Sequence, residues 1–222
     1  MKKKRVLLVS CSIILLCLTI IAGMTYSLFT DNFSVKNHLE AGKLNITLQR
    51  TYLEYNVLNE LGVLDTIVDD TLYDFTKETN ENVFGLDAKG IKIVPGSYFD
   101  AKMKVVNDNS DPNSQNYSNV AFNYSVEIKL VKGYNELARQ MQVVVTSHDG
   151  VSVTKRLSDV YSEGYVFELG TLLAGEESQE FSVRVEFLDD LNYAGMDNDL
   201  AQGEGLVFDL VVKAVQVTDT NS

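Results

Sequence analysis

Histidine, cysteine and carboxylate side chains decide what chemistry this chain can carry, and the first two are scarce. The two histidines, His38 and His148, lie far apart in sequence, and both cysteines, Cys11 and Cys17, lie in an apolar segment near the N-terminus. The sequence has no His-Glu-x-x-His motif and no Gly-rich phosphate loop. The rest of the chain therefore lacks a thiolate nucleophile or a cysteine-based zinc site. We identify no catalytic residue, no cofactor-binding residue and no metal ligand set.

Two acidic loops are rich in the oxygen ligands that calcium prefers. Residues 107–111 read NDNSD, and a second cluster combines Asp189 and Asp190 with residues 197–199, which read DND. Calcium takes roughly six to eight oxygen ligands, which such clusters supply. Neither loop has the spacing of an EF-hand, and solvated turns use the same residue types. Calcium binding and solvated turns both remain open as interpretations.

The N-terminal residues have the layout of a secretory signal. Residues 1–5 read MKKKR, and residues 6–22 are mostly apolar. A charged segment followed by an apolar one predicts a signal peptide over residues 1–27, preceding the folded domain as a helix. A permanent membrane anchor is the alternative, since the apolar run is just short of a spanning helix. Lipidation of Cys11, which follows Leu-Val-Ser, is a further alternative.

The end of this segment is predicted to be cut by a signal peptidase. Thr25 and Ser27 supply small side chains at the −3 and −1 positions of a cut before Leu28. The cleavage residues are thus Ser27 and Leu28, with a cut before Phe29 as the alternative. Only chains that keep the signal peptide uncut would remain attached to the membrane.

The charge of the predicted mature chain restricts its partners. Residues 28–222 keep 15 Lys and Arg against 31 Asp and Glu, a net charge of −16. Such a charge argues against nucleic acid and anionic lipid as partners. A secreted chain without cysteine must be held by its core alone, which favours a Gram-positive bacterial exoprotein. We therefore expect a location outside the cell, in the matrix or at the surface.

Period-two alternation of apolar and polar residues predicts at least seven strands. Only two short helices are predicted, at 134–140 and within 189–201, and Asp149-Gly150 predicts a tight hairpin. The fold class is all-β, a jelly-roll-like antiparallel β-sandwich with long loops. We expect one domain over 28–222, with an N-terminal arm at 28–40 and an insertion at 51–94. The alternating runs are 44–48, 99–106, 119–131, 141–145, 165–169, 181–187 and 206–217.

Several short motifs resemble the TasA/camelysin family when taken in order. The stretch YSLFTD at 26–31, followed by LEAGKLNI at 39–46, resembles the start of that family. PGSY at 95–98 resembles its Pro-Gly-Asp element, although Ser97 stands where Asp is common. LAGEE at 173–177 and the segment 202–217 resemble its closing strands. The resemblance covers the signal and both ends of the domain, and leaves out 51–94.

The resemblance implies a secreted jelly-roll protein that is exported through a dedicated signal peptidase. Several such proteins build biofilm matrix and form fibres, in which the N-terminal segment of one subunit completes the sheet of the next. The expected partners are further copies of the chain and other matrix proteins. The camelysin branch also implies a cell-surface metalloendopeptidase, for which this sequence has no recognisable zinc ligand set. A monomeric surface adhesin or ligand-binding module is a third hypothesis.

The segment after the predicted cut has the pattern of a donated strand. Phe29, Asp31, Phe33 and Val35 fall on one face of an extended segment, and three of these four are apolar. Such a face fills a groove in a neighbour, while main-chain hydrogen bonds supply affinity. The alternative is that residues 28–37 fold back as an edge strand of their own domain.

Overall fold

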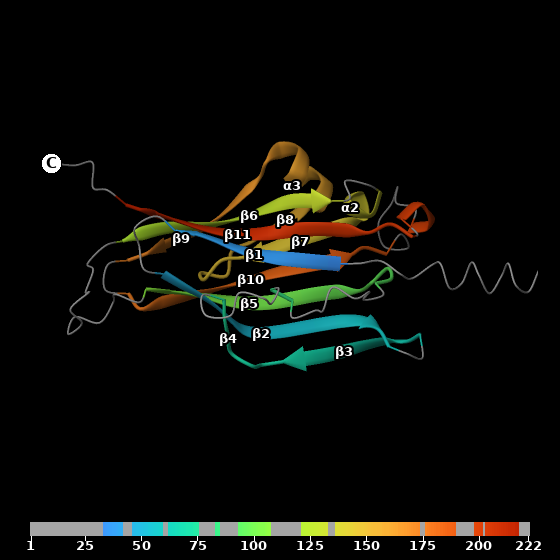
Figure 1. Cartoon of the computed structure of the whole chain (residues 1–222), viewed down its shortest axis with the longest axis horizontal. Helices are drawn as coiled ribbons and strands as arrows, with labels where there is room; N and C mark the ends of the chain where they lie inside the picture. The colour runs from blue at the N-terminus through green and yellow to red at the C-terminus, as the bar shows by residue number, and fades with distance from the viewer. Residues whose placement is uncertain are drawn as a thin grey trace, which may run out of the picture.

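Two packed β-sheets form the body of the molecule in the computed structural model (Figure 1). The described residues are 33–41, 46–59, 62–75, 83–84, 93–107, 121–132, 136–173, 176–189, 198–201 and 203–217. In chain order the elements are β1 Phe33–Ala41, β2 Ile46–Leu58, β3 Leu64–Asp69, β4 Tyr73–Asp74, β5 Tyr98–Asn107, β6 Phe122–Lys132, α2 Glu136–Gln140, β7 Met141–Thr146, β8 Ser152–Arg156, α3 Leu157–Glu163, β9 Val166–Leu172, β10 Ser178–Phe187, the 3₁₀ turn η1 Asn198–Ala201 and β11 Leu206–Gln216.

The strand order confirms the predicted jelly-roll-like sandwich. One sheet has four strands in the order β1-β11-β6-β9, and the other has seven, in the order β3-β2-β5-β10-β7-β8 with β4 on β2. From β5 onward the chain passes repeatedly from one sheet to the other. Among the described strands, every pair is antiparallel except β1 with β11, which is parallel.

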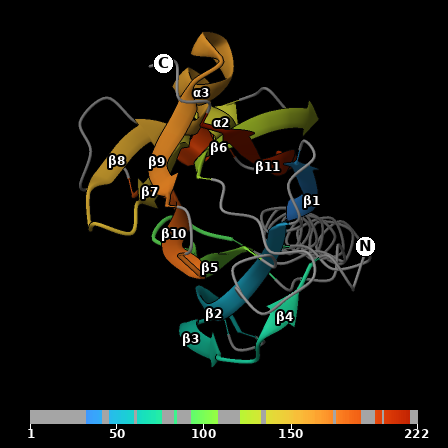
Figure 2. The same cartoon turned by 90° about the vertical axis from the view of Figure 1, so that its left-hand side faces the viewer.

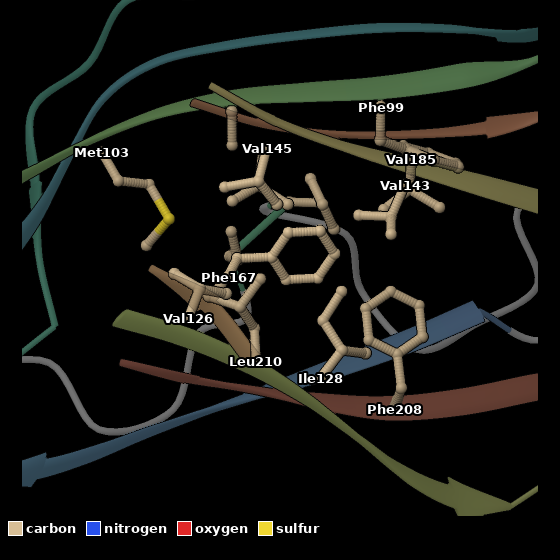
Figure 3. Close-up of a cluster of buried hydrophobic side chains, with 14 of the residues drawn as sticks. Phe99, Met103, Val126, Ile128, Val143, Val145, Phe167, Val185, Phe208 and Leu210 are labelled. Atoms are coloured by element: carbon tan, nitrogen blue, oxygen red, sulfur yellow. The ribbon is translucent and has the colours of Figure 1, made fainter. Parts of the chain in front are cut away.

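The core lies between the two sheets and is built from the alternating residues (Figure 3). In β5, Phe99, Ala101, Met103 and Val105 are buried while the residues between them are half-buried or exposed. β6, β7 and β10 have the same pattern of burial, so the alternation predicted in these segments is confirmed. β11 lies inside its sheet, and Val211 is buried on the face away from the core.

β2 is longer than its sequence pattern predicts, because a β-bulge divides it. Its residues in the core are Ile46 and Leu48 before the bulge and Leu53 and Val57 after it, with Thr51 as the extra residue. The strand therefore continues through residues 51–58, which the sequence placed in an insertion. β3 and β4, two short elements of the same segment, extend the seven-stranded sheet on β2.

The turns and helices agree with most of the sequence expectations. Gly150, with a φ of 82°, closes the predicted hairpin between β7 and β8, where its N–H donates to the Ser147 carbonyl. α2 lies within the predicted helix at 134–140, and η1 lies at the end of the second predicted region. α3 was not predicted. It buries Leu157 and Val160 and ends at Gly164, which adopts the left-handed conformation.

Candidate assembly edge

Two of the six predicted site residues lie in the part of the chain that the structure describes. Ser27, Leu28, Phe29 and Asp31 lie outside the described residues. The other two members of the predicted assembly strand, residues 33 and 35, lie in β1, the edge strand of the four-stranded sheet. Figures 1 and 2 show β1 alongside β11. The fold-back alternative is thus the arrangement within one copy of the chain, and exchange between copies stays a prediction.

The register between β1 and β11 sets apolar residues opposite apolar residues at several positions. Phe33 stands opposite Leu206 and Val35 stands opposite Phe208, and both β11 residues are buried. Leu39 stands opposite buried Val212, whereas Asn37 stands opposite buried Leu210 and interrupts the apolar series. Because side chains alternate with period two, a shift by one residue would place polar residues at all of these positions. The apolar pattern therefore disfavours a shift of the register by one residue.

Opposite charges meet in the same register on the alternate residues. Lys36 stands opposite Asp209, and Glu40 stands opposite Lys213. Among the described residues, Asp209 has a buried carboxylate oxygen, Oδ1, with no hydrogen-bond partner. Adjacent opposite charges favour a strand pair, and like charges disfavour it. The register thus sets apolar residues opposite apolar residues at 33, 35 and 39 and opposite charges at 36 and 40, while the polar residues 34, 37 and 38 stand opposite apolar ones.

On the other side, β11 is held firmly by β6. The two strands pair from Val207 to Gln216, and Lys213 Nζ lies 2.7 Å from Glu127 Oε2 across the pair. The hydrogen bond from Lys213 holds the pKa of Glu127 below its ordinary value. With β11 fixed in this way, its other edge can pair with an extended strand of matching sequence.

Neither histidine lies in a metal or catalytic constellation among the described residues. His148 is exposed in the β7–β8 turn, and a Cβ added at Gly170 would lie 3.1 Å from its Cε1 atom. His38 stands opposite Val211 in the β1 register. The described residues include no group of three His, Cys, Asp or Glu side chains suited to a metal ion. Of the two predicted calcium loops, residues 108–111 and 190–197 lie outside the described ranges.

A polar network on the outer face of the seven-stranded sheet was not predicted from the sequence. The Tyr52 and Tyr98 hydroxyls donate to the two carboxylate oxygens of Glu54, at 2.6 and 2.5 Å. The Arg184 guanidinium lies 3.7 Å from the Tyr98 ring centroid and 3.7 Å from Asp100 Oδ2. The sequence signal for this network was that Tyr52 and Glu54 alternate with apolar residues, as in a strand with one outer face. The bulge at Thr51 breaks the alternation with the first half of β2, so the strand was not recognised.

The pKa values in this network argue for a structural role. The hydrogen bonds from the tyrosines lower the pKa of Glu54, and the bond to Glu54 raises the pKa of Tyr52 to about 12. The same carboxylate raises the pKa of Tyr98. General acid–base catalysis needs groups that titrate near the working pH, and the shifts of Glu54 and the two tyrosines move away from neutrality, although burial raises the pKa of Asp100 beside Arg184. The network therefore cross-links β2, β5 and β10.

The fold and this edge define a β-sandwich in which β1 is an edge strand of the four-stranded sheet. No family model matches the chain, and no curated protein matches it. Among solved structures, it is similar to AvmM, which catalyses macrocyclization in alchivemycin A biosynthesis, with 14% identity and a TM-score of 0.27 over 58% of this chain and 84% of that one. That similarity is too low to inform the fold or the function. Within the described ranges, no helix is long and apolar enough to cross a membrane.

Proposed function

We propose that this chain is a secreted structural protein of a Gram-positive cell surface or biofilm matrix. Its copies assemble by exchanging the N-terminal strand, and other matrix proteins join the same assembly. The observation that carries the proposal is the register of β1 on β11, which pairs apolar residues at 33, 35 and 39 and opposite charges at 36 and 40. The strongly acidic composition and the signal-like N-terminus agree with an exported protein.

β1 is suited to exchange because of how it joins the domain. Only residues 42–45 separate it from β2, which lies in the other sheet. Its partner β11 lies far from β1 along the chain, so no turn connects the two paired strands directly. The same parallel pair can therefore form within one copy or between two copies. Exchange of an identical element between copies is a low-cost route to assembly.

A charge-exchange experiment separates pairing between copies from pairing within one copy. In Lys36→Glu, the arm carries the same charge as Asp209, and in Asp209→Lys the edge carries the same charge as Lys36. Each variant alone disfavours pairing, whether in cis or in trans. In an equal mixture, the arm of each variant complements the edge of the other. We expect the mixture to form fibres at the concentration at which the unmodified chain does, and each variant alone to need a higher concentration, by electron microscopy.

Two controls make this experiment decisive. Ser34→Asp changes charge on the same strand at a position opposite Val207, so it tests a general effect of charge on the arm. The double variant Lys36→Glu/Asp209→Lys restores complementarity within a single chain and should assemble alone. A mixture that assembles no better than either variant alone, while the double variant assembles like the unmodified chain, would contradict exchange between copies. Monomers of the unmodified chain at every concentration would contradict the assembly itself.

A further inference from the structure

The seven-stranded sheet has two open edges with different surfaces. β3 and β8 are its edge strands, and no described strand pairs with the outer side of either (Figure 2). Natural proteins usually protect such edges because unpaired main-chain groups attract other strands. The charges on these two edge strands determine which edges of two copies can pair.

β3 is an unusually apolar edge. Its Ile67 and Val68 side chains are 43% and 54% exposed, and both faces of the strand are accessible. Five exposed apolar side chains gather on β3 and its flanks: Val63, Leu64, Ile67, Val68 and Leu72. The strand has neither proline nor lysine, the residues that commonly blunt an edge. The surface is therefore suited to a partner strand.

The two edges carry opposite charges. Residues 62–72, around β3, include three aspartates and no basic residue, while β8 ends in Lys155 and Arg156 and contains no acidic residue. Two copies joined β3 to β3 would place aspartates against aspartates, and copies joined β8 to β8 would place cations against cations. Like charges across a strand pair are destabilising. Only the joint between β3 and β8 brings opposite charges together.

The direction of the strands fits that joint. Five antiparallel pairings separate β8 from β3, so the two edge strands run in opposite directions. A second copy in the same orientation, displaced along the sheet, therefore meets β3 with an antiparallel β8. Such a head-to-tail contact uses two different surfaces and does not close on itself, so it generates an open filament.

The hydrogen-bonding phase of the two edges also matches. One row of paired residues crosses all six strands, and its pairs alternate between hydrogen-bonded and non-hydrogen-bonded types. The pairing of β8 with β7 and the pairing of β2 with β3 are the first and fifth in this row, so they are of the same type. The main-chain N–H and C=O groups of the row's two end residues, Lys155 and Ile67, therefore have the same orientation relative to the free edge of their strand. Odd-numbered residues of β3 can then pair with odd-numbered residues of β8. The row is Lys155, Val143, Val185, Phe99, Tyr55 and Ile67.

We infer that β3 of one copy pairs with β8 of the next, in the register that sets Ile67 opposite Val153. That register places Asp65 opposite Lys155 and Thr66 opposite Thr154. Ile67 and Val153 then form an apolar pair and Asp65 and Lys155 an ion pair, while Val68 stands opposite Ser152 and Leu64 opposite Arg156. Lys155 Nζ already lies 3.5 Å from Glu163 Oε2 within its own copy, and Asp65 adds a second carboxylate. The joint extends the sheet from copy to copy and does not depend on exchange of β1.

Charge reversal tests the partner. Asp65→Lys in residues 28–222 places a cation against Lys155 and should weaken self-association at least about tenfold by sedimentation velocity. Adding Lys155→Glu to the same chain should restore association. Asp70→Lys is the matched control, because it makes the same charge change just beyond the end of β3. Equal losses in Asp65→Lys and Asp70→Lys, or no rescue by the second change, would overturn the inference.

Disulfide trapping tests the register. Residues 28–222 contain no cysteine, and antiparallel neighbours lie within disulfide range. We expect Thr66→Cys/Thr154→Cys to form a ladder of covalent oligomers on oxidation, while either single cysteine stops at dimers. Thr66 also hydrogen-bonds Tyr98, so circular dichroism should confirm that the variant is folded. A folded double variant that yields no ladder would contradict the joint, whatever the outcome for the N-terminal arm.

Discussion

At the scale of single residues, Arg50 is a buried cation that joins three segments. Its guanidinium donates to the Val83 carbonyl at 3.1 Å and to Asp69 Oδ2 at 3.3 Å, and it lies 5.4 Å from the Tyr73 ring centroid. The residue is only 2% exposed. Arg50 thus ties the end of β3 and the segment at 83–84 to β2.

Replacing Arg50 with methionine should destabilise the fold by about 2–3 kcal/mol, because a buried carbonyl and a carboxylate lose their donor. Urea unfolding measures this loss. Arg139→Ala is the control, since Arg139 forms an exposed pair with Glu136 that is worth about 0.5 kcal/mol or less. Equal losses in the two variants would show that burial of Arg50 does not matter.

Glu54 makes stability depend on pH. Its pKa is lowered from 4.5 by the two tyrosine hydrogen bonds. A lowered pKa in the folded state stabilises the fold above the unfolded pKa, and this stabilisation disappears as the pH falls through the folded value. The difference in unfolding free energy between the unmodified chain and Glu54→Gln should be steady from about pH 7 to pH 5 and shrink below pH 4.5. Urea titrations across this range check it, and a constant difference would contradict the assignment.

At the scale of elements, strands with regular alternation of apolar and polar residues could be predicted from the sequence. The strand with a bulge at Thr51 could be predicted only in part. β5 and β10 keep one phase throughout, so their buried residues could be read from the sequence. β2 changes phase at Thr51, and no single period describes it. α3 was missed because it is only seven residues long and its N-cap position, Arg156, has no side-chain capping hydrogen bond, so the apolar spacing of Leu157 and Val160 covers a single turn.

The candidate edge was partly predictable for the same reason. The alternation that suggested an extended arm is a local property of the sequence. Its partner strand, β11, lies far along the chain, and nothing local reveals a parallel pairing across that separation. The complementary edges β3 and β8 were likewise hidden, since their relation depends on the order of all six strands.

Removing the bulge tests its role in β2. Deletion of Thr51 would remove the extra residue while Arg50 stays opposite Met103 and Tyr52 stays opposite Lys102, so the residues after the bulge would keep their places in the core. We therefore expect the deletion variant to fold, with a circular dichroism spectrum like that of the unmodified chain. Thr51→Ala is the control, because it removes the exposed hydrogen bonds of Thr51 to Lys102 and Glu180 but keeps the bulge, and should unfold within about 1 kcal/mol of the unmodified chain. An unfolded deletion variant beside a stable Thr51→Ala would mean that β2 needs the bend at the bulge.

At the scale of the whole molecule, the two proposed contacts would let an assembly of copies grow in two directions. The β1–β11 edge belongs to the four-stranded sheet, while the β3 and β8 edges belong to the other. The two contacts therefore lie on different sheets of the sandwich. Loss of one should leave the other measurable, so variants at Lys36 and at Asp65 should have additive effects on association.

The acidic charge of the chain opposes both contacts at long range. Each copy of residues 28–222 carries a net charge of −16, and the screening length falls from about 30 Å at 0.01 M salt to about 8 Å at 0.15 M. Repulsion between whole molecules should therefore weaken more than the close Asp65–Lys155 attraction. We expect assembly, followed by light scattering, to become faster as sodium chloride rises over this range. Glu168→Gln/Glu177→Gln, which neutralises two exposed carboxylates away from the proposed contact residues, should assemble faster at low salt and respond less to added salt. Slower assembly at the higher salt concentration would mean that local ion pairs, and not the total charge, control association.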